Sequence, residues 1–289
     1  MATAIRLFVN IMKHFVLFFI LFASRSTAQV PDLYNHITND VHQIRSRKLN
    51  QDRQVYIHVP KTDTTDTTHT FPILYLLDGE NHFHIVSAYV EYLRHWKVIP
   101  PMIVVGIVSV NRVKDLTPVN SLINFDGKPD SSYKTSGGNE LFLDFIQQEL
   151  MPYIEATYKT SPFRIFAGHS FGGLTVINCM LTRPDMFGAY VAISPSFWFG
   201  NKYVLRLAEQ KFPKLALRDK KLFYSVGNEE GAFRDDVLKF DRLVQQDSSK
   251  TFQHQYKYYF SEDHMTEPVP ALYDALRFIY RNWTHDQQN

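Results

Sequence analysis

Cysteine is the scarcest residue of this chain, with Cys179 alone among 289 residues. A single cysteine cannot form an intramolecular disulfide, so the sequence excludes a small scaffold held together by disulfides. Hydrophobic residues make up 45% of the chain, which is enough for a large core without such a cross-link. Because Cys179 lies in an apolar run with helical spacing, we expect a buried core residue rather than a reactive thiol.

The chain also has little net charge. Its formal charge is +2, and three basic residues, Arg6, Lys13 and Arg25, stand in the first 28 residues, which contain no Asp or Glu. Without those three, 28 basic and 29 acidic side chains remain. Binding to nucleic acid or to an anionic membrane surface needs clustered basic residues, so this balance predicts neither partner.

The first 28 residues have the three parts of a secretory signal peptide. Lys13 precedes a continuous apolar run at residues 15–23, and Ser26-Thr27-Ala28 follows it. The run has nine residues, fewer than the roughly 20 that span a bilayer. We therefore expect residues 1–28 to be a signal peptide cleaved after Ala28, which leaves a secreted or periplasmic protein. An uncleaved N-terminal anchor is the alternative, since residues 5–12 lengthen the apolar region.

Metal-binding motifs are missing as well. The sequence has no His-Glu-x-x-His, and His82 and His84 form a close pair with no third ligand beside them. We expect neither a metal nor another cofactor.

Short apolar runs alternate with amphipathic stretches along most of the chain. The runs have the length and composition of β-strands, whereas residues 140–154 and 269–283 have the apolar spacing of helices. Such alternation predicts the α/β class, with a mostly parallel sheet and helices on both faces. No linker after residue 50 divides the chain, so we expect residues 29–289 to form one domain. The predicted strands are residues 55–60, 71–77, 102–110, 163–167, 188–193 and 222–226.

A serine stands where a predicted strand meets a predicted helix. Residues 168–172 read Gly-His-Ser-Phe-Gly, a Gly-x-Ser-x-Gly motif. A strand, a sharp turn and a helix in this order are the context of the nucleophile elbow of α/β-hydrolases. Gly168 and Gly172 are expected to remove side chains that would collide in the turn. Ser170 is therefore the candidate nucleophile, and an ordinary helix-capping serine is the alternative.

A serine hydroxyl needs a base within hydrogen-bond reach, and in this fold the base follows the last strand. Three histidines follow Ser170 along the chain. His254 lies within an alternating, strand-like run, and His285 lies in the polar C-terminal tail. His264 lies in the loop between that run and the last predicted helix, and we expect it to be the base.

A carboxylate completes such a triad by holding the histidine in one tautomer, and it should follow the strand that ends at residue 226. Glu229 and Glu230 both stand directly after this strand. We favour Glu230, because the orienting carboxylate often lies three residues beyond the glycine that ends the strand. Glu229 is the alternative acid, and Asp235 or Asp236 could also reach the site.

An oxyanion hole needs two backbone N–H groups. One is expected from Phe171, directly after the nucleophile, and the other from the loop that follows the strand at residues 71–77. Within that loop we choose the backbone amide of Glu80, the residue after Gly79.

Several segments of the chain form a recognisable set. They are residues 73–79 (ILYLLDG), 115–118 (DLTP), 168–173 (GHSFGG), 193–198 (ISPSFW) and 272–278 (LYDALRF), together with His264. Between residues 54 and 283, the chain resembles an esterase family of the α/β-hydrolases. That family includes enterochelin and other siderophore esterases, S-formylglutathione hydrolase (esterase D) and feruloyl esterases. The resemblance implies hydrolysis of a carboxylic ester through an acyl-serine intermediate, with Ser170 as nucleophile and His264 as base.

Other residues are candidates for substrate binding. Trp198 and Ser196 follow a predicted strand and could line the acyl pocket. Residues 124–138 form the longest candidate loop, and loops of that length are often functional. Arg112 could meet an anionic substrate, but a structural pair with Asp115 is the favoured interpretation.

These observations together predict an exported serine esterase with a Ser-His-Glu triad that acts on a small-molecule ester, with a siderophore-type ester as a candidate substrate. Two alternatives stay open. An acyltransferase would use the same catalytic groups, and a catalytically inactive binding module could keep the same fold.

Overall fold

The computed structural model describes residues 40–61, 70–229, 231–246 and 251–284. Residues 37–289 group into one compact unit. The predicted signal peptide, residues 1–28, lies outside the described residues. Among the helices that are described, none is long and apolar enough to cross a membrane.

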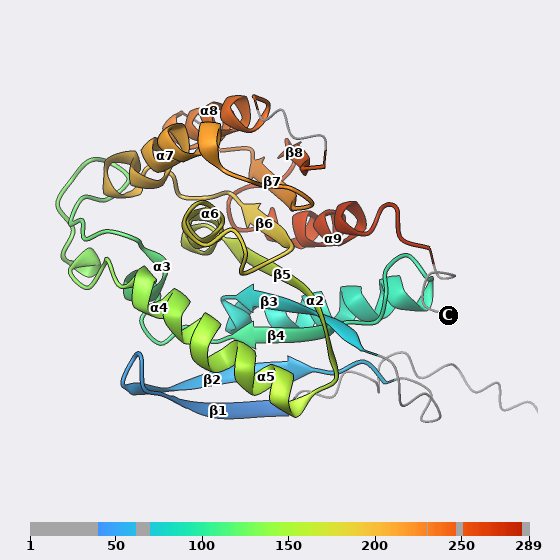
Figure 1. The fold of residues 1–289 in the computed structure, drawn as a ribbon. Coiled ribbons are helices and arrows are strands. Elements are labelled where there is room, and N and C mark those ends of the chain that lie inside the picture. The colour runs from blue at the N-terminus through green and yellow to red at the C-terminus, as the bar shows by residue number, and fades with distance from the viewer. Residues whose placement is uncertain (1–39, 62–69, 230, 247–250, 285–289) are drawn as a thin grey trace, which may run out of the picture. The chain divides into compact units, whose positions relative to one another are not determined.

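The described residues form an eight-stranded sheet with the strand order β1-β2-β4-β3-β5-β6-β7-β8 (Figure 1). The pairs β1/β2 and β2/β4 are antiparallel, and the other neighbouring pairs are parallel. This confirms the predicted mostly parallel sheet. The strands are β1 (Asp40–Ser46), β2 (Gln51–His58), β3 (Phe71–Leu77), β4 (Ile103–Ile107), β5 (Thr160–His169), β6 (Ala189–Ile193), β7 (Lys221–Gly227) and β8 (Gln253–Tyr259).

Helices cover both faces of this sheet, as predicted (Figure 1). One face carries α2 (Gly79–His95) and α9 (Pro268–Ile279), which also contact each other. Further helices lie on the opposite face, and a π-helical turn, residues 146–150, joins α4 to α5. They are α3 (Arg112–Leu116), α4 (Asn139–Phe145), α5 (Met151–Thr157), α6 (Phe171–Thr182), α7 (Phe199–Lys211) and α8 (Ala232–Val244).

The two faces of the sheet belong to two hydrophobic cores. In β3, Ile73, Tyr75 and Leu77 pack into the core beneath α4 to α8. The alternate residues, Leu74 and Leu76, pack into the core beneath α2 and α9. Successive side chains of a strand point to opposite faces, so a strand buried on both faces must be apolar throughout. This explains the continuous apolar runs of the sequence.

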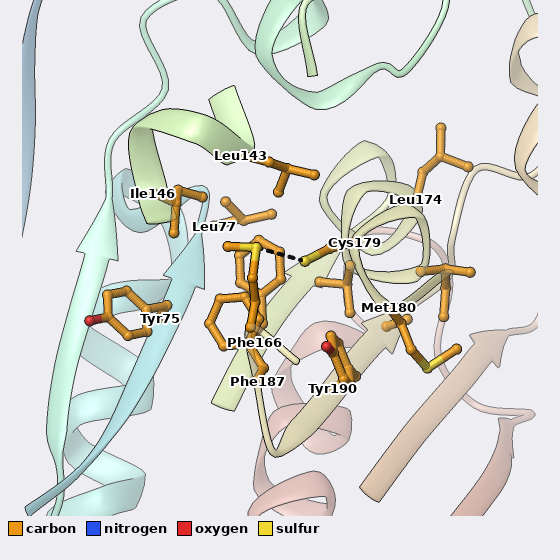
Figure 2. Packing of buried hydrophobic residues seen from close by; sticks show 14 of the residues in the cluster. Tyr75, Leu77, Leu143, Ile146, Phe166, Leu174, Cys179, Met180, Phe187 and Tyr190 are labelled. Carbon is orange, nitrogen blue, oxygen red and sulfur yellow. Dashed lines mark hydrogen bonds between the residues drawn. The ribbon is translucent and has the colours of Figure 1, made fainter. Parts of the chain in front are cut away.

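Helix α6 carries Cys179 into the first of these cores (Figure 2). The thiol is fully buried, and its Sγ lies 3.8 Å from Sδ of Met186. The neighbouring rings of Phe166 and Phe187 stack with their centroids 4.6 Å apart. Burial raises the pKa of the Cys179 thiol, which suppresses the reactive thiolate. The expectation of a core cysteine is confirmed.

A buried ion pair joins the antiparallel part of the sheet to α3. Arg53 of β2 donates to Oδ2 of Asp115 at 2.6 Å and to the Val108 carbonyl at 3.1 Å. Both charged side chains are almost completely inaccessible. The favoured pairing of Asp115 with Arg112 is therefore wrong, because Asp115 pairs with the buried guanidinium of Arg53.

The parallel strands end at one edge of the sheet. Parallel neighbours share one direction, so the residues that follow β3, β5, β6 and β7 must gather at the carboxyl edge, where ligands of α/β sheets bind. Asp78, Ser170 and Ser194 directly follow β3, β5 and β6, and Glu229 stands two residues after the end of β7.

Candidate active site

Ser170 stands at the turn between β5 and α6 in a left-handed backbone conformation, with φ of 61° and ψ of −116°. Such a φ is rare for a residue with a side chain and needs support from the surrounding structure. The support is local: the Ser170 amide donates to the Ile193 carbonyl at 2.9 Å, and the Ser170 carbonyl accepts from Leu174 at 2.9 Å. The strained elbow that the motif predicts is present.

Glycines permit this turn by close backbone contact. A Cβ atom on Gly168 would lie 2.5 Å from the carbonyl carbon of Gly172, and one on Gly173 would lie 2.8 Å from the Ile193 oxygen. A Cβ on Gly172 would meet nothing closer than Oδ2 of Asp78, at an ordinary 3.4 Å. The prediction for Gly168 is confirmed, but the one for Gly172 is wrong. Gly173 is the second glycine without space for a side chain.

His264 reaches the site from the loop between β8 and α9, and Glu229 reaches it from the turn after β7. His264 Nδ1 lies 3.1 Å from Oε2 of Glu229. Glu230, the favoured acid, lies outside the described residues, so the geometry supports the alternative, Glu229. Asp236 is not available for this role, since it is buried and pairs with Lys202 at 2.7 Å.

Ser170, Glu229 and His264 line one cavity of about 530 Å³, a volume typical of small-molecule sites. The Ser170 hydroxyl lies 3.1 Å from the hydroxyl of Ser196. Ser196 and Trp198, the two predicted substrate-binding residues, line the same cavity. The structure therefore brings the candidate nucleophile, base, alternative acid and both pocket residues together.

Aromatic side chains form much of the cavity wall. Phe125 and Tyr133 come from the 124–138 loop, and Phe233 comes from α8. Ring centroids of Phe125 and Tyr133 lie 5.7 Å and 6.2 Å from that of Trp198, in edge-to-face arrangements. The length of the loop indicated that it could be functional, but only the fold shows which of its residues face the site.

Arg112 contributes a positive charge at the edge of this cavity. Its guanidinium binds both carboxylate oxygens of Asp78, at 2.8 Å and 2.9 Å, and also donates to the His169 carbonyl at 3.1 Å. This bidentate geometry is strong and directional. Arg112 therefore joins the end of β3 to the end of β5, directly before Ser170.

The predicted oxyanion donors differ in where they lie. Phe171 lines the cavity, whereas Glu80 is exposed in the first turn of α2. The Glu80 carboxylate accepts from the Ser109 amide at 3.1 Å. Asp78, two residues earlier, lines a second cavity of about 490 Å³ that also contains Ser170. Asn81 and His82 line this cavity too, whereas Glu80 does not, so the choice of Glu80 stays a prediction.

A second histidine packs against the candidate base. The ring centroids of His169 and His264 lie 4.5 Å apart. Burial, with the nearby charges of His264, His82 and Arg112, lowers the pKa of His169 to about 2. His169 therefore stays neutral near neutral pH and adds no positive charge beside the imidazole of His264. Within the described part of the chain, no group of three His, Cys, Asp or Glu side chains is placed to hold a metal ion.

Comparison with known proteins identifies the family. The sequence matches the family described as "Putative esterase" over residues 46–277. This chain belongs to that esterase family. The predicted resemblance is thereby confirmed.

Curated relatives of this chain include two whose names give a siderophore as the substrate. The ferri-bacillibactin esterase BesA of Bacillus subtilis (strain 168) is 33% identical over 170 residues, which is 54% of this chain and 58% of the relative. The siderophore enterobactin esterase of Emericella nidulans is 36% identical over 120 residues, 39% of each chain. The matches thus span little more than half, or less, of these relatives' own length.

Solved structures confirm the α/β-hydrolase fold of this chain. An IroE-like serine hydrolase from Shewanella oneidensis superposes with a TM-score of 0.82 at 30% identity, covering 87% of this chain and 83% of that one. The siderophore hydrolase EstB from Aspergillus nidulans has a TM-score of 0.68 at 20% identity, covering 86% of this chain and 96% of that one. At that identity, EstB supports the fold alone.

The elbow glycines of this chain allow a matched test. We expect Gly168→Ala to destabilise the fold by about 2 to 3 kcal/mol, because its methyl group would overlap backbone atoms that cannot move independently. Gly172→Ala should cost less than about 1 kcal/mol, since its methyl group has space and alanine favours a helix. Urea unfolding of both variants measures the difference, and equal losses would contradict the assignment of the close contact.

Proposed function

We propose that this chain hydrolyses carboxylic esters through an acyl-serine intermediate, with Ser170 as nucleophile, His264 as general base and Glu229 as the orienting acid. The contact that supports this most is the 3.1 Å approach of His264 Nδ1 to Glu229, beside Ser170 in one cavity. A carboxylate at Nδ1 keeps the proton on that nitrogen. The lone pair of Nε2 is then free to accept the serine proton.

The chemistry proceeds in two balanced halves. His264 takes the Ser170 proton as Oγ bonds to the ester carbonyl carbon, and the imidazolium then gives that proton to the departing alcohol. Water enters in the second half, gives a proton to His264 and attacks the carbonyl carbon of the acyl-serine. The bond between that carbon and Oγ then breaks, His264 returns the proton to Oγ, and the acid is released. Glu229 stabilises the imidazolium in both halves.

Negative charge develops on the carbonyl oxygen in each half. The amide of Phe171 is the first N–H of α6, and the first N–H groups of a helix have no partner within it. In the proposed site this amide donates to the oxyanion. The second donor belongs to the turn that begins at Asp78, where the sequence favours the amide of Glu80.

A siderophore-type ester is the proposed substrate class. The names of the two curated relatives support it, since one acts on ferri-bacillibactin and the other on enterobactin. The walls of the cavity support it independently, because Phe125, Tyr133, Trp198 and Phe233 offer ring faces and edges to an aryl group. Arg112 at the cavity edge suits a substrate with negative charge.

Removing the nucleophile tests the mechanism. We expect Ser170→Ala to lower kcat for a short p-nitrophenyl ester by at least about 10³-fold, since the variant lacks the Oγ on which the proposed mechanism forms the acyl intermediate. Ser161→Ala, at the opposite end of β5, is the matched control and should keep wild-type activity. Hydrolysis that survives in Ser170→Ala would overturn the mechanism.

Replacing each of the two glutamates by glutamine tests which of them is the acid of the triad. We expect Glu229→Gln to lower kcat by roughly 10²- to 10⁴-fold, because an amide neither holds the Nδ1–H tautomer nor stabilises the imidazolium. Glu230→Gln should stay within about threefold of the wild type. Steady-state kinetics of both variants decides between them, and a larger loss in Glu230→Gln would return the role to Glu230.

We also propose that the protein is exported after cleavage of residues 1–28. The support is the order of basic, apolar and small residues in that segment. Expression of the full chain should give a secreted or periplasmic product that begins at Gln29, as read by mass spectrometry of its N-terminal peptide. A full-length product in the membrane fraction would instead establish the uncleaved anchor.

A further inference from the structure

A buried serine hydroxyl lies between two carboxyl groups behind the candidate triad. Ser194 follows β6 directly, with a left-handed φ of 38°. Its Oγ contacts both Oε1 of Glu229 and Oε2 of Glu267. Ser194 and Glu267 are completely inaccessible to solvent. A continuous line of contacts therefore runs from Glu267 through Ser194 and Glu229 to His264.

The number of protons in this line is constrained. A hydroxyl has one proton to donate, and an ionised carboxylate has none. Ser194 can therefore satisfy two carboxyl groups only if one of them carries a proton and donates to the hydroxyl oxygen. Two ionised carboxylates on this hydroxyl would leave a buried anion without a donor, since the other hydroxyl near Glu267, that of Ser225, makes no hydrogen bond among the described residues.

The protonated member is Glu267 rather than Glu229. Glu229 lines the open cavity and meets the Nδ1 of His264, which favours its anionic form. Glu267 is completely buried at the start of α9, and its Oε1 has no hydrogen-bond partner among the described residues. Burial raises the pKa of Glu267 to about 7, against the opposing effect of the Ser194 and Ser225 hydroxyls, and the charge of Glu229 raises it further.

We propose that Glu267 is a positioning residue of the ester-hydrolysing site: its protonated carboxyl donates to Ser194, and Ser194 donates in turn to Oε1 of Glu229. This rests on the proposed function of the triad. The donation occupies one oxygen of Glu229 and so fixes the rotation of that carboxylate. The other oxygen, Oε2, then faces Nδ1 of His264.

Loss of the Glu267 proton would disturb this arrangement. The single proton of Ser194 would be divided between two anions, and Glu229 would lose its fixed donor. The other titratable groups that interact with Glu267 are His264 and, on β8, Tyr256 and Tyr259. The Tyr259 hydroxyl donates to Asp274, so it does not replace the missing proton.

Glutamine at position 267 is the decisive variant, because its amide always donates and never ionises. We expect the wild type to lose kcat as the pH rises through about 7, and Glu267→Gln to lack this alkaline fall, with kcat near the wild-type value at about pH 6. Glu267→Leu removes the donor and should lower kcat about tenfold or more at every pH, with little change in KM. Ser194→Ala should match that loss, and the Ser194→Ala/Glu267→Leu double variant should lose no more.

Two kinetic outcomes would overturn the proposal. One is a loss of kcat in Glu267→Gln as large as the loss in Glu267→Leu, which would mean that the ionised carboxylate is required. The other is an alkaline fall that persists in Glu267→Gln, which would assign the titration to another group. Thermal unfolding of each variant identifies any loss of kcat that is caused by a destabilised fold.

A readout without catalysis separates this proposal from the proposed function. Below about pH 6 the folded wild type should show the infrared C=O stretch of a buried carboxylic acid, and Glu267→Gln should lack it. Absence of that band in the folded wild type overturns the proposal, whether or not the protein hydrolyses esters. The free energy of unfolding should depend on pH in the same direction. The contribution of protonated Glu267 to it is complete below about pH 4.5 and is lost as the pH rises through about 7. Glu267→Gln should lack this fall.

Discussion

The backbone contact within the elbow is the constraint on which the site depends. Ser170 keeps its left-handed φ because its amide is bound to the Ile193 carbonyl of β6 and because the absence of a side chain on Gly168 lets α6 approach β5. The contact sets the start of α6, the direction of the Ser170 side chain and the position of the Phe171 amide together. A methyl group on Gly168 would therefore move the nucleophile and the oxyanion donor at once.

Around the elbow, the parallel sheet brings residues from distant parts of the chain to one edge. Two polar networks support Ser170 from opposite sides. On one side Arg112 holds Asp78 and the His169 carbonyl, and on the other Glu229 holds His264. Arg112 and Glu229 also line the cavity, so supporting charges are close to any bound substrate.

The second network continues from Glu229 to two buried polar side chains, Ser194 and Glu267. Ser194 and Glu267 lie beneath the cavity, where water cannot satisfy them, so each polar atom depends on a protein partner. In the proposed arrangement, one proton on Glu267 gives each contact of this line a donor. The site thus combines an open, aromatic substrate cavity with a buried polar layer formed by Ser194 and Glu267. The chemistry proposed for Ser170 takes place between the two.

Local patterns in the sequence determined the α/β class, the strand positions of the parallel sheet, the burial of Cys179 and the elbow at Ser170, because each depends on neighbouring residues. β1 was missed, since its side chains alternate between exposed and half-buried and bury little apolar surface. The partners of the site were decided by tertiary structure alone. Glu229 lies 35 residues from His264, and Ser194 lies 73 residues from Glu267. No local pattern distinguishes such carboxylates, because only the packing of distant strands selects which one reaches its partner.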